Sequence, residues 1–401
     1  MAKALEMVRA AADAAVETAD VPGVVALVWQ GGRILDVHAV GVADVATRRP
    51  MRRDAIFPIA SMSKPVTVAA ALRLMDQGKL RLEDPITKWA PEFADMRVLT
   101  RPDGALGDTY PAPSAITIED LMTHRSGLTY GFTSRGPLAA ELMKTVGFGM
   151  SSDMGPDAWM AALAALPLAC APGERFEYGH SIDVLGFILG RACGTTVQEV
   201  MRRELFEPLG MADTGFWVPP GKRERLVVNV SSPAVGEFKS DPITALTTPE
   251  PPAYAPGGQG LVSTADDYLA FARMLVRGGA TDHGRLLKAE TVRLMTTNRL
   301  TSAQRQLPFM GMPFFASTGF GLGMSVIMDA RGHSIRGAGE VGAFGWPGAF
   351  GGWWQGDPAR DAVLIWLQDC LPPPPQAGLP PRMPGMAAVT AFQKAAYQAL
   401  A

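Results

Sequence analysis

The sequence predicts an α/β (α+β) fold, in which both ends of the chain form one antiparallel sheet and a mainly helical segment is inserted between them. Two observations support this prediction. Strand-like runs lie near the N-terminus and again after residue 320, and helical periodicity dominates the residues between them. With 401 residues, 47% of them hydrophobic, the chain can bury one large core. We therefore expect a single domain over residues 1–401, with a sheet lobe at about 1–56 and 215–401 and a helical lobe at about 57–214.

The first part of the chain predicts a helix, a hairpin and a central helix. Residues 3–19 place Ala, Leu, Met and Val at helical spacing. Two apolar runs, 24–29 and 34–42, flank a Gly-Gly turn and therefore predict paired strands. Residues 64–78 are rich in Ala and Val and end in glycine, which predicts a helix that is buried on most of its faces.

The remaining elements follow from the same patterns. Further helices are predicted at 116–124, 159–166, 182–192, 196–207, 265–277, 286–298 and 386–400. Further strands are predicted at 320–328, 332–336, 345–353 and 361–368. The irregular regions are a loop or lid around one short helix at 129–157, a turn-rich stretch with short strands at 214–262, and a Pro-rich linker at 371–384.

Composition and charge argue against several classes of function. The chain has 37 basic and 39 acidic residues and a net charge of -2, so no basic excess indicates nucleic-acid binding. No apolar run reaches the length of a membrane span, and the charged N-terminal helix does not resemble a signal peptide. Three scattered cysteines and five histidines lack metal-ligand spacing. We therefore expect a cytoplasmic protein with no metal or cofactor, and the sequence leaves open whether it forms a homo-oligomer.

Ser61 and Lys64 form an S-x-x-K pair at the start of the predicted central helix. Three helical residues are nearly one turn, so the two side chains lie on one face. A serine hydroxyl becomes a nucleophile when a nearby base takes its proton, and a buried lysine can be that base. The alternative is an accidental motif, with a serine cap and a surface lysine. The apolar helix favours the catalytic interpretation, because an isolated buried charge is costly.

Tyr178 is a second candidate, since it follows a turn and precedes an apolar helix and can therefore point into a cleft. A tyrosine beside an ammonium group can shuttle protons to a leaving group. The alternative is a core tyrosine whose hydroxyl is hydrogen-bonded. His180 is either a polar wall of the site or a structural histidine, and Asp183 is expected to cap or anchor the next helix.

The glycine-rich run 345–352 is a third candidate. Glycine in a strand marks a bulge or a close approach of another group to the backbone. A backbone N–H from this run, together with that of Ser61, would form an oxyanion hole. A tight turn rich in Gly and Pro is the alternative.

Together these motifs resemble the serine β-lactamase and penicillin-binding-protein superfamily, in the class C-like branch that includes family VIII carboxylesterases and related acyltransferases. The similarity covers roughly residues 8–400. Ser61-Met62-Ser63-Lys64 matches S-x-x-K, and Tyr178-Gly179-His180 stands where the branch has Y-x-N. Residues 121–128 (LMTHRSGL) resemble L-L-T-H-x-S-G-L, and residues 257–264 (GGQGLVST) resemble G-G-G-L-x-S-T.

The resemblance implies a role for each motif. Ser61 would be the acylated nucleophile, Lys64 and Tyr178 would form the general base, and Tyr178 would return the proton to the leaving group. The backbone N–H groups of Ser61 and Ala349 would form the oxyanion hole. Where lactamases have K-T-G, this chain has Trp346-Pro347-Gly348, similar to the W-x-G of the esterase branch.

These departures bear on the substrate. An indole in place of a cation removes a charge-assisted contact to an anionic antibiotic, and His180 replaces the asparagine of Y-x-N. We therefore expect esters of uncharged alcohols or phenols, and slow β-lactam hydrolysis stays open as a side activity. Flexible apolar residues on the loops either line an acyl pocket or pack beneath those loops. The candidate substrate-binding residues are His180, Trp346, Gly348, Tyr130, Phe148 and Phe315.

The sequence therefore favours a serine carboxylesterase that hydrolyses short- to medium-chain carboxylic esters, a small-molecule substrate, through an acyl-serine intermediate. The same serine would also serve an acyltransferase, in which an alcohol replaces water, or a β-lactamase or D-amino-acid peptidase. A non-catalytic, penicillin-binding-like sensor is a rival from a different class. The intact Ser61, Lys64 and Tyr178 argue against it.

Overall fold

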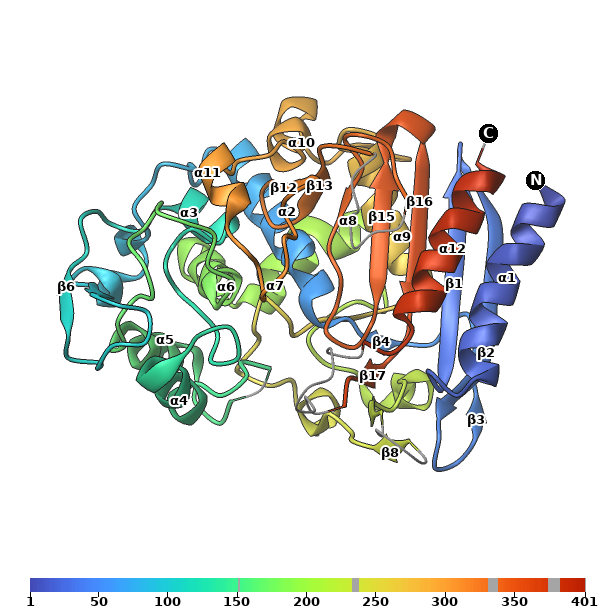
Figure 1. Cartoon of the computed structure of the whole chain (residues 1–401), viewed down its shortest axis with the longest axis horizontal. Coiled ribbons are helices and arrows are strands. Elements are labelled where there is room, and N and C mark those ends of the chain that lie inside the picture. Colours follow the sequence, from blue (N-terminus) through green and yellow to red (C-terminus); the bar gives the residue numbers. More distant parts are fainter. Residues whose placement is uncertain (151, 233–237, 331–337, 374–382, 401) are drawn as a thin grey trace.

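The computed structural model describes residues 1–150, 152–232, 238–330, 338–373 and 383–400. An eight-stranded antiparallel sheet dominates one side of the molecule, with strand order β12-β13-β14-β15-β16-β1-β2-β3 (Figure 1). Its strands are β1 (Gly23–Gln30), β2 (Arg33–Asp44), β3 (Arg49–Pro50), β12 (Thr318–Phe320), β13 (Ser325–Ile327), β14 (Phe344–Gly345), β15 (Trp353–Asp357) and β16 (Ala362–Leu367). Strands β1 and β16 pair with Val25 opposite Leu367 and so join the two ends of the chain. The predicted α/β fold is confirmed.

Strand β1 is covered on both faces, which explains its uninterrupted apolar sequence. On one face lie helices α1 (Ala2–Glu17) and α12 (Met386–Ala399), which run side by side although they are the two ends of the chain (Figure 1). On the other face lies α9 (Ala265–Val276). The alternate residues of β1 divide between the two cores, Val24, Ala26 and Val28 toward α1 and α12, and Val25, Leu27 and Trp29 toward the main core.

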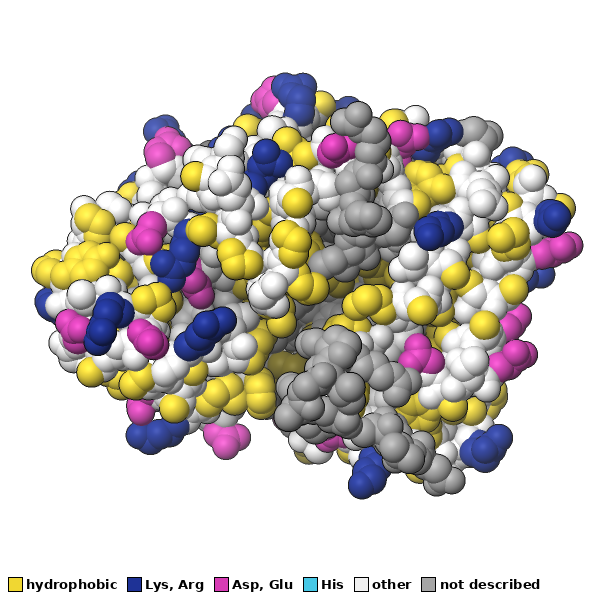
Figure 2. Space-filling view, viewed as in Figure 1, with side chains coloured by type: hydrophobic (Ala, Val, Ile, Leu, Met, Phe, Trp, Pro, Cys, Tyr) yellow, Lys and Arg dark blue, Asp and Glu magenta, His cyan; other side chains and the backbone are white. Residues whose placement is uncertain are grey.

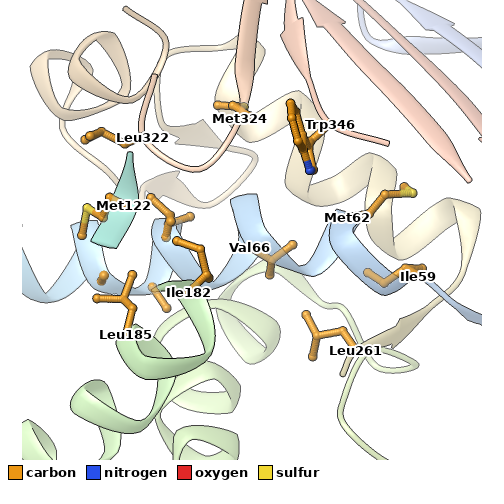
Figure 3. Close-up of a cluster of buried hydrophobic side chains, with 14 of the residues drawn as sticks. Ile59, Met62, Val66, Met122, Ile182, Leu185, Leu261, Leu322, Met324 and Trp346 are labelled. Atoms are coloured by element: carbon orange, nitrogen blue, oxygen red, sulfur yellow. The ribbon is translucent and has the colours of Figure 1, made fainter. Parts of the chain in front are cut away.

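Helix α2 (Ser63–Asp76) runs through the centre of the molecule, directly after a single 3-10 turn, Ala60–Met62. Most of its residues are buried, as its Ala- and Val-rich sequence predicts. Figure 3 shows apolar side chains gathered around it, with Val66 of α2 near Ile182 of helix α6 (Ser181–Cys193) and Trp346 on the side of the sheet. This packing fixes the turn that carries Ser61 against both halves of the molecule.

The helical region and the short strand pairs complete the fold. The remaining helices are α3 (Ile118–Met122), α4 (Gly136–Thr145), α5 (Pro156–Ala164), α7 (Val197–Met201), α8 (Glu207–Leu209), α10 (Ala289–Met295) and α11 (Ser302–Gln306). The small sheets pair β4 (Phe57–Pro58) with β9 (Val262–Ser263), β5 (Arg97–Leu99) with β6 (Thr109–Pro111), β10 (Ala280–Thr281) with β11 (Gly284–Arg285), and β7 (Val230–Ser231) with both β8 (Lys239–Ser240) and β17 (Cys370–Leu371). The β4–β9 pair brings the glycine-rich turn at 257–260 beside the Ser61 turn.

Two strand predictions were wrong in detail. Residues 345–353 are not one strand, because β14 ends at Gly345 and β15 begins only at Trp353. Gly351 has a φ of +88°, which lies outside the strand conformation, and Pro347 has no N–H for a ladder. Residues 320–328 contain the end of β12 and all of β13, separated by a turn at Gly323, whose φ is +80°.

Other predictions concern residues that the structure does not describe or boundaries that it does not test. The strand predicted at 332–336 lies outside the described residues, as does most of the linker predicted at 371–384. The boundaries of the two predicted lobes stay a prediction.

Candidate active site

Ser61 lies in the 3-10 turn that leads into α2, and Lys64 lies one turn further along the same face. Lys64 Nζ donates a hydrogen bond of 3.0 Å to Ser61 Oγ. Lys64 is fully buried, whereas Ser61 is partly exposed. Ala60, directly before the serine, has a φ of +43°, a conformation that an alanine rarely adopts and that concentrates at functional sites. The predicted pair therefore exists as a contact between a buried lysine and a partly exposed serine.

Tyr178 reaches the same hydroxyl from the helical region. Its OH donates a hydrogen bond of 2.8 Å to Ser61 Oγ, and its ring lies 4.7 Å from Lys64 Nζ. The backbone around Tyr178 is held in place, because Thr133 Oγ1 donates to its carbonyl at 2.8 Å. Gly179 must be glycine, since a Cβ there would lie 2.2 Å from the carbonyl oxygen of Leu128. The structure thus brings Ser61, Lys64 and Tyr178 together as the sequence predicted.

The glycine-rich turn provides the second acceptor for Lys64. Lys64 Nζ donates to the carbonyl oxygen of Gly258 at 2.9 Å, and the N–H of Gly258 donates to Asp183 Oδ1 at 2.8 Å. A Cβ on Gly258 would lie only 2.6 Å from that carboxylate oxygen. The lack of a side chain at this position is therefore what lets the turn fit between Lys64 and Asp183.

Trp346 also contacts the hydroxyl of Tyr178. Its indole Nε1 donates to the phenolic oxygen at 3.1 Å, and the indole is 2% exposed. An N–H that points at a phenolic oxygen stabilises negative charge on that oxygen. The sequence placed Trp346 in the site, but the bond to Tyr178 joins residues 168 positions apart and has no sequence signal.

The loop after β14 lies against the Ser61 turn. A Cβ on Gly348 would lie 2.6 Å from the carbonyl oxygen of Ile59, so this backbone closely approaches the turn that carries Ser61. The loop is closed by a bond of 2.7 Å from the N–H of Gly348 to the carbonyl oxygen of Gly352. Ala349 follows Gly348 and is exposed.

His180 and Tyr130 lie beside the site but are completely or almost completely buried. His180 Nδ1 lies 3.1 Å from Asp183 Oδ2, and Tyr130 OH donates to the same oxygen at 3.3 Å. Asp183, in the first turn of α6, therefore contacts the side chain of the residue at its own helix N-cap and binds groups from two other segments, those of Tyr130 and Gly258. Burial and the Asp183 carboxylate together raise the pKa of Tyr130 well above its usual value. A Cβ on Gly149 would lie 2.8 Å from His180 Cε1, so the 147–150 segment covers this histidine.

Phe148 and Phe315, the two candidate pocket residues on loops, occupy opposite environments. Phe148 is 60% exposed, and its ring lies 6.4 Å from that of Phe132. Phe315 is 1% exposed and packs edge-to-face on Phe176, 4.9 Å away. Only Phe148 therefore has a surface that a substrate can reach without rearrangement of the core.

His124 is a site residue to which the sequence assigned no role. Its ring lies 4.7 Å from the ring of Tyr178, its carbonyl oxygen accepts the N–H of Glu177 at 2.7 Å, and Nδ1 faces the N–H of Gly179 at 3.4 Å. Burial, with Lys64 nearby, lowers the pKa of His124 well below its usual value. A neutral imidazole thus holds the segment that carries Tyr178. Its only signal was its position in the LMTHRSGL stretch.

The described part of the chain contains no cluster of three or more His, Cys, Asp or Glu side chains that could hold a metal ion. In the same residues, no helix is both long enough and apolar enough to cross a bilayer. Cys170, Cys193 and Cys370 are free thiols. Figure 2 shows acidic and basic side chains intermixed on the face viewed, which agrees with the small net charge.

Residues 8–383 match the protein-family model described as Beta-lactamase. The chain belongs to the beta-lactamase family. It is similar to Protein Rv1367c of Mycobacterium tuberculosis (strain ATCC 25618 / H37Rv), with 45% identity over 350 residues that cover 87% of this chain and 86% of that protein. Esterase EstB of Burkholderia gladioli is 35% identical over 262 residues, which cover 62% of this chain and 64% of EstB. Among solved structures, EstCE1, a hydrolase with promiscuous acyltransferase activity, has a TM-score of 0.80 at 26% identity and covers 98% of both chains.

Within the beta-lactamase family, the similarity to EstB supports the predicted relation to the esterase branch. The resemblance inferred from the S-x-x-K, Y-x-N and glycine-rich motifs is therefore confirmed at the level of family and fold. The roles of the individual residues follow from the geometry and remain proposals.

Proposed function

We propose that this member of the beta-lactamase family is a serine carboxylesterase that hydrolyses short- to medium-chain esters of uncharged alcohols or phenols. The observation that carries the proposal is the convergence of two hydrogen bonds on Ser61 Oγ, from Lys64 Nζ at 3.0 Å and from Tyr178 OH at 2.8 Å. Two proton-transfer groups on one partly exposed hydroxyl are what nucleophilic catalysis by serine requires.

Acylation joins Ser61 Oγ to the carbonyl carbon of the ester, while the serine proton moves to the Lys64–Tyr178 pair. Both partners donate to Ser61 in the resting geometry, so one of them must lose a proton before attack. The indole N–H of Trp346 favours negative charge on the Tyr178 oxygen, with the Lys64 ammonium beside the ring. Tyr178 then gives the proton to the leaving alkoxide, which departs as the alcohol.

Deacylation repeats these steps with water, which attacks the acyl-serine and gives up a proton to the same pair. The pair returns that proton to Ser61 Oγ as the bond from Oγ to the acyl carbon breaks and the carboxylic acid leaves. In both steps negative charge develops on the carbonyl oxygen. We propose that the backbone N–H groups of Ser61 and Ala349 stabilise it. The close approach of Gly348 to Ile59 supports this pairing, because it holds the loop beside the Ser61 turn. These residues supply the nucleophile and the proton transfer, so the chemistry needs no metal or cofactor.

The ester substrate is favoured by what surrounds Tyr178. Phe309 lies 5.5 Å from the Tyr178 ring, and Phe314 and Phe320 lie 5.6 and 5.1 Å from the ring of Trp346. These rings offer no charge to an anionic substrate, whereas an uncharged ester loses little on entering such surroundings. The similarity to Esterase EstB supports the same substrate class.

An acyltransferase is the second candidate, because the same acyl-serine can be attacked by an alcohol in place of water. The structural similarity to EstCE1, a hydrolase with promiscuous acyltransferase activity, favours this alternative specifically. A β-lactamase or D-amino-acid peptidase would use the same serine, but the apolar Trp346 argues against an anionic substrate. A non-catalytic sensor would not require two proton-transfer groups on one serine hydroxyl.

The test is a chromophore burst with p-nitrophenyl acetate and butyrate, together with labelling of Ser61 by a fluorophosphonate. We expect a burst and a covalent adduct, and both should disappear in Ser61→Ala. Turnover of nitrocefin should be much slower than that of the esters, and added short alcohols should reveal any transfer as a new ester. An intact, folded protein that gives neither burst nor adduct would overturn the enzymatic proposal. A cytoplasmic location and the oligomeric state stay predictions from the sequence.

A further inference from the structure

The buried ammonium of Lys64 is surrounded by uncharged groups at contact distance. It donates to Ser61 Oγ and to the carbonyl oxygen of Gly258, and it lies 4.7 and 5.4 Å from the ring centroids of Tyr178 and Tyr130. A fully buried charge with neutral contacts is costly unless an opposite charge acts on it from close by.

Asp183 is in a position to supply that charge. Its side chain is completely buried, and its two oxygens accept from the N–H of Gly258, from Tyr130 OH and from His180 Nδ1 if that atom carries the proton. Gly258 bridges the two charges, since its N–H binds the carboxylate and its carbonyl oxygen binds Lys64 Nζ. One glycine residue therefore separates the carboxylate from the ammonium.

We infer that Asp183 is a positioning residue for Lys64 and acts through Gly258: its carboxylate fixes the backbone carbonyl that orients the amine, and its negative charge lies one residue away from that amine. This inference rests on the proposed function, because it assigns Asp183 to the same proton-transfer reaction. Nothing in the S-x-x-K or Y-x-N motifs indicates such a role for a residue five positions after Tyr178.

The other titratable groups around Lys64 do not compete for this role. Tyr130 is held as a neutral phenol by burial and by Asp183, which raise its pKa. His124, on the far side of Tyr178, is held neutral by burial and by Lys64, which lower its pKa. The two remaining titratable groups bind other members of the site: His180 contacts Asp183, and Tyr178 donates to Ser61.

The test is Asp183→Asn in the full-length protein, measured as kcat/KM for p-nitrophenyl acetate from acidic to alkaline pH. Asparagine keeps the shape and an acceptor for Gly258 but removes the charge. Removing a negative charge this close to the site should move the acid limb of the pH profile to lower pH by about one unit. The plateau should fall about tenfold or more, because Gly258 is held less firmly.

Asp267→Asn is the matched control. Asp267 is another buried carboxylate, and it accepts a backbone N–H from Asp213 at 2.7 Å and the hydroxyl of Thr214 at 2.9 Å. It lies on α9 and makes neither of these bonds to Ser61, Lys64, Tyr178 or Gly258. Asp267→Asn should lower the melting temperature and leave the acid limb of the kcat/KM profile unchanged. If Asp183→Asn lowers activity without moving the limb, Asp183 is only structural and the inference fails.

Asp183→Glu keeps the proposal testable if the asparagine variant does not fold. It retains the charge and misplaces Gly258, so the plateau should fall while the acid limb stays within a few tenths of a unit of the wild-type position. A limb that moves as far as one unit in this charge-retaining variant contradicts the inference. Fluorophosphonate labelling of wild-type Ser61 distinguishes failure of the proposed function from failure of this inference. Absence of labelling overturns the proposed function. Normal labelling with an unshifted pH profile in Asp183→Asn overturns only the role of Asp183.

Discussion

Two walls meet at Tyr178, and they are built from different chemistry. The polar wall comprises Lys64, Tyr130, His180, Asp183 and Gly258. Lys64 donates to the carbonyl oxygen of Gly258, and the carboxylate of Asp183 is bound by the N–H of Gly258, by Tyr130 and by His180. The aromatic wall comprises Phe176, Phe309, Phe314, Phe320 and Trp346, whose rings contact one another at centroid distances of 4.9 to 6.2 Å. Only one hydrogen bond, from Trp346 Nε1, joins the aromatic wall to the hydroxyl of Tyr178.

This difference separates two tasks of the site. In the proposed mechanism the polar wall controls where protons and charge reside, so changes there should reduce the rate on every substrate. The aromatic wall lacks charge, and its partly buried members, Phe176 and Phe309, offer apolar surface. Changes there should therefore act mainly on which substrates bind and only modestly on proton transfer. The predictions below test this division, starting with the largest expected effect.

Lys64→Met should abolish most of the activity. Methionine fills a similar volume without charge, so kcat should fall at least about a thousandfold because the base is lost. Stability should stay constant or rise, since replacing a buried charge by an apolar side chain is often neutral or stabilising. Steady-state kinetics and thermal unfolding measure both effects, and the exposed Lys79→Met is the control. A Lys64→Met variant that is unstable but active would assign Lys64 to the fold instead.

Tyr178→Phe should have the next largest effect. The ring and its contacts with His124 and Trp346 stay, but the hydroxyl that bonds Ser61 is lost. General acid–base groups contribute about 10²- to 10⁴-fold, and kcat should fall by that amount while KM changes little. Tyr397→Phe, which removes a partly buried hydroxyl bonded to Asp357, provides the control. Equal losses in the two variants would show that the effect is structural.

The sequence predicted local relations better than long-range ones. Ser61 and Lys64 are one helical turn apart, so their contact followed from helix geometry alone. The β1–β2 hairpin and α2 followed from periodicity and glycine stops in the same way. Local pattern singled out Tyr178 as a candidate, and the family resemblance then placed it with Ser61 and Lys64, across a distance in the chain that no local pattern can bridge.

What the sequence missed depends on packing between distant segments. Residues 345–353 were predicted as one strand, yet Pro347 and Gly351 interrupt it with a loop between β14 and β15. The burial of His180 beneath the 147–150 segment and the link from Asp183 to Gly258 also arise from tertiary contacts, over spans of about 30 and 75 residues. No helical or strand period contains such information.

Trp346→Phe tests the one bond between the walls. Phenylalanine keeps an aromatic ring but cannot donate to the Tyr178 oxygen, and loss of one such bond should lower kcat about tenfold. Trp366→Phe is the matched control, because it removes the same volume and an indole bond to Gln368 on the α12 face of the sheet. If Trp346→Phe changes only KM, the aromatic wall acts on binding alone and the division between the walls is complete.

Phe148→Ser should have the smallest effect and should act on selectivity alone. Phe148 is 60% exposed at the rim of the polar wall, near Phe132, which stacks on Tyr130. If its ring covers part of the acyl chain, kcat/KM should fall about threefold for p-nitrophenyl butyrate and stay constant for the acetate, which lacks the added methylenes. The melting temperature should not change, as is usual for a surface side chain, and Met7→Ser on α1 controls for a general loss of exposed apolar surface. An equal fall for both esters would place the acyl chain away from Phe148 and leave the aromatic wall as the surface that selects the substrate.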